Sequence, residues 1–132
     1  MSVHCLDDVN EQQLLQCSFV ERKGLSDHSP PGMKLASDEL AKRFFKCTKR
    51  PSNLHVREFG KFNQRYPLLF RDYLRSHPDS AAYYGKIKLE LAKKVGDDPD
   101  AYYDIRDPVT DLIMVAAAEW GQRIAWSEPQ AD

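Results

Sequence analysis

Two runs of alternating polar and apolar residues predict a β-hairpin in the first half of the chain. Residues 42–48 alternate in this way, and a turn at 49–52 leads into a second alternating run at 53–58. Residues 18–23 contain several β-formers and predict one more short strand. We therefore expect a small, mostly antiparallel sheet near the N-terminus.

After residue 60 the apolar positions recur every three or four residues, which predicts helices. Three prolines mark expected helix starts, since a proline at the first helical position lacks only an N–H that has no partner there. These prolines are Pro78, Pro99 and Pro108. Asp98 and Asp107 precede two of them and are suited to cap a helix. The expected buried stripe of the last helix comprises Val109, Leu112, Ile113, Ala116, Trp120 and Ile124.

One further helix is predicted from Leu6, because Leu6, Val9 and Leu14 recur about once per turn. The segment 24–38 is rich in Ser, Asp, Pro and Gly and predicts a loop. The fold class is thus α+β, with a small N-terminal sheet and a helix followed by three to four C-terminal helices. We expect one domain over residues 1–132, with a strand-rich part at 1–60, a helical part at 61–126 and a tail at 127–132.

The composition is that of a globular protein, with 42% apolar and 30% charged residues. The net charge of −1 provides no overall field toward nucleic acid, so nucleic-acid binding is not expected and any polyanion site must be local. The three cysteines lack metal-ligand spacing, and the chain has neither a secretion signal nor an apolar run of membrane-spanning length. We expect a cytoplasmic protein without a metal site or membrane association. Open sheet edges allow a homodimer or a partner chain.

Five segments, in this order, resemble the GrpB family, a branch of the nucleotidyltransferase-like fold. They are DHSPPG at 27–32, KRFF at 42–45, NLHVRE at 53–58, LLFRDYLRSHP at 68–78 and YYDIRDPVTDLI at 102–113. The resemblance extends from about Leu6 to about Trp126. It implies a fold in which a Gly-Ser at a helix start holds nucleotide phosphates and an Asp-x-Asp or Asp-x-Glu strand binds divalent metal.

The sequence departs from that family pattern where the catalytic groups are implied. It contains no Gly-Ser dipeptide, and its Asp-x-Asp, Asp98-Pro99-Asp100, is typical of a helix cap. We therefore expect a partial nucleotidyltransferase-like fold that is not a competent transferase on its own, with unassigned catalytic residues. Two alternatives stay open. One is a nucleotide- and Mg-dependent nucleotidyltransferase whose catalytic segment lies upstream of Met1, and the other is a phosphate- or nucleotide-binding or dimerising assembly module.

The strongest candidates for phosphate or nucleotide binding lie on the predicted hairpin. Asn53, His55 and Arg57 share one face of a strand, so this polar trio should face a groove or solvent. His55 is equally compatible with a groove residue and with a hydrogen-bonded structural histidine. Arg43, on the neighbouring strand, can either join His55, if the register allows, or form a surface ion pair.

Other candidates come from the loop and the helices. Asp27 and His28 can reach across the same groove, although a rigid Asp turn is favoured. A secondary basic patch comprises Arg71, Arg75 and Arg106, for which salt bridges, to Asp72 or Asp79 in the case of Arg71 and Arg75, are the favoured account. Expected core residues include Cys17, Cys47, Tyr73, Tyr83, Tyr84, Tyr102, Tyr103, Trp120 and Trp126.

Overall fold

A computed structural model describes residues 1–129 of the chain, so the last part of the predicted tail, 130–132, lies outside the described residues. The fold class is α+β, as predicted. The chain forms two compact units, one over Met1–Arg65 and one that begins at Tyr66. The elements are β1 (Ser2–Val3), α1 (Glu11–Gln16), β2 (Phe19–Glu21), β3 (Arg43–Cys47), β4 (Asn53–Glu58), α2 (Phe62–Ser76), α3 (Pro78–Val95) and α4 (Pro99–Arg123).

The first unit contains a four-stranded sheet in the order β1-β4-β3-β2. β3 and β4 form the predicted antiparallel hairpin, β2 pairs antiparallel with β3, and β1 pairs parallel with β4. Facing residues of the hairpin are Arg43 and Val56, Phe44 and His55, Phe45 and Leu54, and Lys46 and Asn53. Because directly opposed residues point to the same side of a sheet, this register assigns every side chain of the hairpin to one of two faces.

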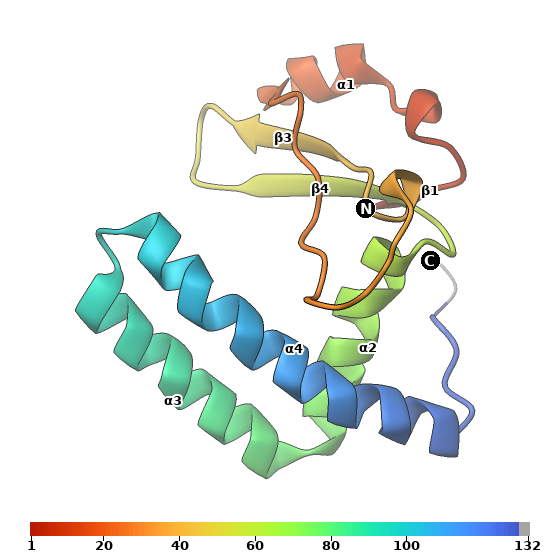
Figure 1. Cartoon of the computed structure of the whole chain (residues 1–132). Coiled ribbons are helices and arrows are strands. Elements are labelled where there is room, and N and C mark those ends of the chain that lie inside the picture. Colours follow the sequence, from red (N-terminus) through yellow and green to blue (C-terminus); the bar gives the residue numbers. More distant parts are fainter. Residues whose placement is uncertain (130–132) are drawn as a thin grey trace. The chain divides into compact units, whose positions relative to one another are not determined.

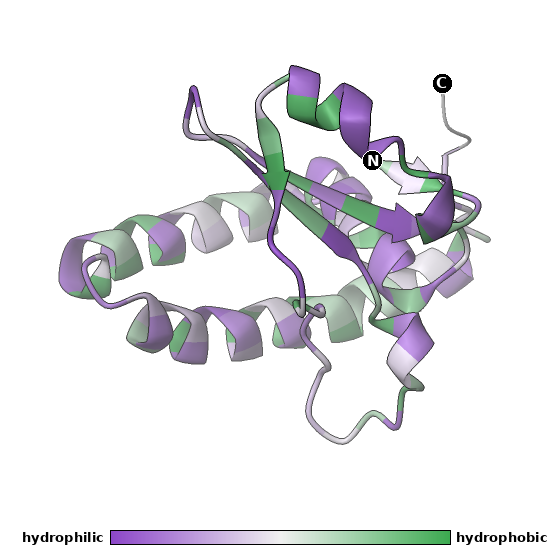
Figure 2. Ribbon diagram, turned by 90° about the horizontal axis from the view of Figure 1, so that it is seen from above, coloured by the Kyte–Doolittle hydropathy of each residue, from purple (hydrophilic) through white to green (hydrophobic). Residues whose placement is uncertain are grey.

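The inner face of the hairpin carries the hydrophobic core of this unit. Phe45 and Val56 are almost fully buried, at 1% and 0% exposure, and pack with Val9. Figure 1 shows α1 lying over this side of the strands, and Figure 2 shows polar and apolar positions alternating along them. The opposite, outer face carries Phe44, His55 and Arg57.

The predicted first helix is divided in two. A 3-10 turn at Leu6–Asp8 is followed by α1, which begins only at Glu11. Val9 between them has an extended backbone and is buried. Asn10 caps α1 by accepting a hydrogen bond from the Gln13 backbone N–H. A strong cap thus starts a new helix where the periodicity alone suggested one continuous element.

The second unit is helical, and α3 and α4 pack against each other (Figure 1). Pro78 and Pro99 begin these helices as predicted, and Asp98 caps α4 by accepting from the Ala101 N–H at 3.0 Å. The predicted helix start at Pro108 is wrong, because Pro108 lies inside α4. A proline removes only one helical hydrogen bond, so a proline does not by itself mark the start of a helix.

The buried stripe of α4 is also rotated from the predicted one. Leu112 is 74% exposed and Ile124 50% exposed, whereas Thr110, Ala117 and Gly121 are buried. Small side chains allow neighbouring elements to approach, and a Cβ on Gly121 would lie only 3.1 Å from Leu69 Cδ1. At Gly121, therefore, a close approach of the chain favours a small residue on the buried face.

The expectation that the helical aromatic residues and cysteines form core is only partly correct. Tyr73 and Cys47 are buried, at 9% and 8% exposure. Tyr83 and Tyr103 are 69% and 50% exposed, and Cys17 is exposed as well. Part of the apolar surface of α3 and α4 is therefore not buried within the second unit.

Candidate functional site

The outer face of the hairpin brings together several polar side chains. His55 and Arg57 extend from the same side of β4, and the His55 ring packs on Phe44 of β3 with ring centroids 4.8 Å apart. Lys42 directly precedes β3, and continuing the hairpin register places it opposite Arg57. The local strand geometry thus sets two cations beside each other on one face.

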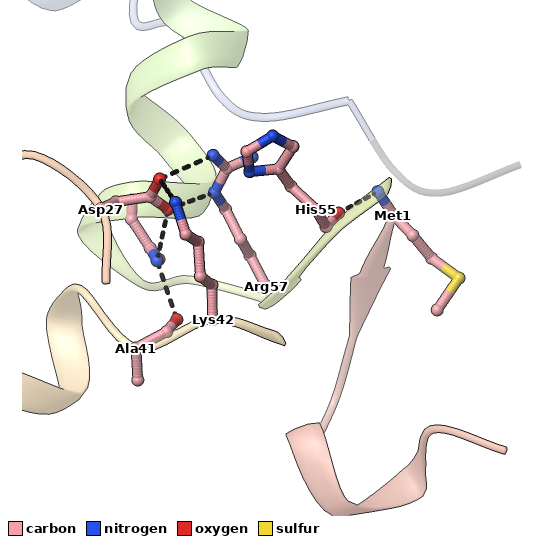
Figure 3. A network of polar contacts seen from close by, with 7 residues as sticks. Met1, Asp27, Ala41, Lys42, His55 and Arg57 are labelled. Atoms are coloured by element: carbon pink, nitrogen blue, oxygen red, sulfur yellow. Dashed lines mark hydrogen bonds and ion pairs between the residues drawn. The ribbon is translucent and has the colours of Figure 1, made fainter. Parts of the chain in front are cut away.

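Asp27, from the long loop between β2 and β3, contacts both of these cations (Figure 3). Arg57 Nε and Nη2 donate to its two carboxylate oxygens at 2.6 and 3.0 Å, and Lys42 Nζ donates at 2.7 Å. Asn63, in the first turn of α2, donates through Nδ2 to Asp27 at 3.0 Å and to the Ala41 carbonyl at 2.8 Å. We call Asp27, Lys42, Arg57 and Asn63 the Asp27 cluster.

The Asp27 cluster is largely shielded from water. Side-chain exposure is 17% for Asp27, 21% for Arg57 and 10% for Lys42, and Asn63 is 3% exposed. Charge-assisted hydrogen bonds in such surroundings are stronger than in water. The cluster therefore fixes the geometry of the donors around one oxyanion.

The pKa values in and beside the cluster follow from its charges. Burial favours the neutral form of Asp27, but the hydrogen bonds from Arg57 and Lys42 outweigh it, so its pKa is lowered overall. Burial lowers the pKa of His55, and the nearby charges of Arg57 and Lys42 lower it further. At neutral pH the cluster holds two positive charges and one negative charge next to a neutral imidazole.

Two buried polar atoms at this site have no hydrogen-bond partner among the described residues. They are Nδ1 of His55 and Oδ1 of Asn63. Buried polar atoms in native proteins are usually satisfied by protein, water or ligand, and the unpaired ones indicate where a polar group can be received. Both atoms belong to residues that flank or form the Asp27 cluster.

Arg43 lies on the opposite face from His55, because it faces Val56 in the hairpin register. There it donates to Glu21 through Nε and Nη2, both at 2.8 Å, and also bonds Glu11. We call Arg43, Glu11 and Glu21 the Arg43 cluster. The grouping of Arg43 with His55 is therefore wrong, since a shift of one residue along a strand exchanges the faces.

Two sequence candidates, Asn53 and His28, make none of the hydrogen bonds that define the Asp27 cluster. Asn53 shares the face of His55 but is exposed, at the beginning of β4, and His28 is exposed in the loop after Asp27. Asp27 itself crosses to the strand, so it does more than form a turn. Sequence reasoning missed Lys42 and Asn63. Alternation along residues 42–48 places Lys42 on the face of Phe44, but only the register between the strands shows that His55 shares this face. Nothing in the sequence links Asn63 to the hairpin.

The predicted secondary basic patch consists of residues with acidic neighbours. Arg71 donates to Asp72 at 2.8 Å and Arg75 lies 3.9 Å from the same carboxylate. Arg106 is 3.5 Å from Asp107 and its guanidinium lies over the Tyr103 ring. Local ion pairing, the favoured account of these arginines, describes their geometry.

The described residues do not fit a Mg²⁺ site. Within residues 1–129 no group of three His, Cys, Asp or Glu side chains is arranged to hold a metal ion. Asp27, the carboxylate of the outer face, already accepts hydrogen bonds from two cations and an amide. Its oxygens are thus engaged with donors and not directed toward a shared metal position.

Comparisons with known proteins agree with the motifs. The family model described as "GrpB protein" matches residues 2–115. A UPF0157 protein of Pseudomonas aeruginosa is 40% identical over 65 residues, covering 49% of this chain and 26% of that protein. The UPF0157 protein YqkA of Bacillus subtilis is 32% identical over 104 residues, covering 77% of this chain and 29% of that protein.

The chain is also similar to part of a relative whose name differs from those of the UPF0157 proteins. The dephospho-CoA kinase of Mycolicibacterium paratuberculosis is 32% identical over 77 residues, covering 58% of this chain and 19% of that protein. The chain thus spans less than a third of each of these three relatives.

Because the family model matches most of its length, the chain belongs to the GrpB family. None of the helices described in residues 1–129 has both the length and the apolar character needed to cross a membrane.

Proposed function

We propose that this GrpB-family chain binds the phosphate group of a nucleotide-type ligand on the outer face of the β3–β4 hairpin. One observation carries the proposal. The side chains of Arg57, Lys42 and Asn63 converge on a single oxyanion, the carboxylate of Asp27, with four hydrogen bonds of 2.6 to 3.0 Å. A set of donors that holds a carboxylate in this way is equally suited to the oxygens of a phosphate.

The residue types favour phosphate over a neutral ligand. The planar guanidinium of Arg57 presents two parallel N–H groups, which match two phosphate oxygens, and the ammonium of Lys42 adds a compact positive charge. The side chain of His55 lies beside them and carries a buried, unpaired Nδ1. This nitrogen can accept a hydrogen bond from a ligand hydroxyl, or donate one when protonated.

These residues are better suited to bind a phosphate than to catalyse, by themselves, the transfer of a nucleotidyl or phosphoryl group. Transfer of a nucleotidyl or phosphoryl group needs carboxylates that hold Mg²⁺ or a base that accepts a proton. Asp27 is an unsuitable base, since its pKa is lowered and its oxygens accept hydrogen bonds from cations. Any catalytic carboxylates would have to come from other segments of a longer protein or from a partner, a role for which the relatives leave room because they exceed this chain in length.

The relatives also suggest which ligands to test. Their names include dephospho-CoA kinase, so dephospho-CoA and ATP belong in the set together with GTP, CTP and UTP. Pyrophosphate and inorganic phosphate report on the oxyanion site without a base or sugar. We expect the polyphosphates to bind more tightly than inorganic phosphate because they place more charge near Arg57 and Lys42.

The test is isothermal titration calorimetry of the purified chain with each ligand, with and without Mg²⁺. Arg57→Gln should weaken binding of the best ligand at least tenfold, since it removes a charge and two parallel donors. Arg22→Gln is the matched control, because Arg22 is an exposed arginine of the same unit. Its effect should stay within about threefold.

Two results would contradict the proposal. One is a folded chain that binds none of these ligands even when Asp27 is also replaced by Asn. The other is binding that Arg57→Gln and Arg22→Gln weaken equally, which would indicate general attraction to positive charge and no defined site.

A further inference from the structure

The donors of the Asp27 cluster hold an oxyanion that belongs to the protein itself. We infer that Asp27 is an internal competitor, which occupies the oxyanion site until a phosphate displaces it. This inference rests on the proposed function, because it describes how the same donors would change partner. It assigns Asp27 a role opposite to that of a ligand-positioning residue.

Hydrogen-bond geometry indicates that a phosphate would replace the Asp27 carboxylate and would not bind in addition to it. Asp27 uses both parallel N–H groups of Arg57, at 2.6 and 3.0 Å, and also receives Lys42 Nζ at 2.7 Å. The exposures of these side chains, 10% to 21%, leave little of them accessible while Asp27 is in place. A phosphate that uses the same N–H groups must therefore replace the carboxylate.

The charges favour the same exchange. With Asp27 in place, Lys42 and Arg57 retain one positive charge in excess. A terminal phosphate dianion in place of the carboxylate would balance both cations, and the released Asp27 would regain its hydration in solvent. At these donors, electrostatics thus favours a dianionic phosphate over the monoanionic carboxylate of Asp27.

The loop can release the Asp27 side chain without losing its own backbone contacts. The Asp27 N–H donates to the Leu40 carbonyl at 3.0 Å, and Ser26 forms an isolated β-bridge with Ala41. Neither contact involves the carboxylate. Rotation of the Asp27 side chain is therefore sufficient, and the loop between β2 and β3 remains attached to the hairpin during the exchange.

The experiment measures pyrophosphate affinity in Asp27→Asn, which keeps the size of the side chain and removes the competing charge. We expect binding at least fivefold tighter than in the wild type. Asp38→Asn is the matched control, because Asp38 is an aspartate of the same unit that pairs with Lys61 at 2.6 Å, outside the Asp27 cluster. It removes the same charge and should change the affinity less than twofold.

The outcomes separate this inference from the proposed function. Weaker binding in Asp27→Asn than in the wild type would overturn the inference, since Asp27 would then position Arg57, but would leave phosphate binding intact. Equal tightening in Asp27→Asn and Asp38→Asn would also overturn it, because net charge would be the cause. Absence of binding in both the wild type and Asp27→Asn would overturn the proposed function as well.

A second variant covers the case in which Asp27→Asn does not fold. Asp27→Ala removes the carboxylate, so no side-chain oxyanion competes for the donors. Under competition it should bind pyrophosphate more tightly than the wild type. Weaker binding in Asp27→Ala would contradict competition.

Discussion

The two faces of the β3–β4 hairpin each carry an arginine that is paired with a carboxylate, yet their charge balance differs. On the inner face, Arg43 bonds two acids, Glu21 and Glu11, and the cluster has one negative charge in excess. On the outer face, Arg57 shares one acid, Asp27, with Lys42, and the excess charge is positive. Only the outer face is suited to attract an anion, so the same residue type serves a structural role on one face and a proposed binding role on the other.

The largest difference between the faces should appear in packing. Phe45 on the inner face is 1% exposed, whereas its neighbour Phe44 on the outer face is only partly buried. We expect Phe45→Ala to lower the free energy of unfolding by about 3–5 kcal/mol, the usual cost of removing a buried phenylalanine. Phe44→Ala should cost less than half as much. Urea unfolding followed by circular dichroism measures both, and equal losses would contradict the assignment of the core to the inner face.

Removal of one acid should affect the two clusters unequally. Asp27→Asn leaves Lys42 and Arg57 partly buried without an anion, and we expect it to lower the free energy of unfolding by about 1–3 kcal/mol. Glu21→Gln should cost less, since Glu11 remains bonded to Arg43. Chemical denaturation of both variants makes the comparison. Added pyrophosphate should restore stability to Asp27→Asn and not to Glu21→Gln.

The faces should also respond to different ranges of pH. The pKa of His55 is lowered from its ordinary value of 6.5, so between its unfolded and folded pKa the unfolded chain binds a proton that the folded chain does not. Stability should therefore fall as the pH drops below about 6.5, and His55→Gln should reduce this loss. The pKa of Glu21 is lowered from 4.5, chiefly by its hydrogen bond from Arg43, so its stabilising contribution is lost only at more acidic pH. Unfolding free energies at pH 7.5 and 5.5 test the contribution of His55.

The smallest effect is expected away from both clusters. Asp38 is 63% exposed and pairs with Lys61. Exposed ion pairs contribute little to stability, so Asp38→Asn should leave the urea midpoint unchanged within error. A clear shift would mean that the segment before β3 contributes to stability in a way that the exposure of this pair does not indicate.

Much of the local structure could be predicted from short-range patterns. Alternation identified the hairpin, and proline with a preceding residue located the beginnings of α3 and α4. Pro108 shows the limit of this reasoning, because it lies inside α4 and does not begin a helix. Leu112 shows another, since the face of α4 that is buried depends on how closely neighbouring helices approach.

The candidate site depended on information of a different kind. His55 and Arg57 could be placed on one face from the period of a single strand. The cation beside them could not be assigned, because the choice between Lys42 and Arg43 requires the register between β3 and β4, which the sequence of either strand leaves open.

The family, the α+β class and the strand that carries His55 and Arg57 could thus be predicted from the residues alone. The meeting of Asp27 and Asn63, from a loop and a helix, with Arg57 and Lys42 on the outer face of the hairpin could be seen only in the folded chain. Periodicity indicates which way a side chain points within its own element. Contacts between elements depend on register, packing and loop path, which no local pattern encodes.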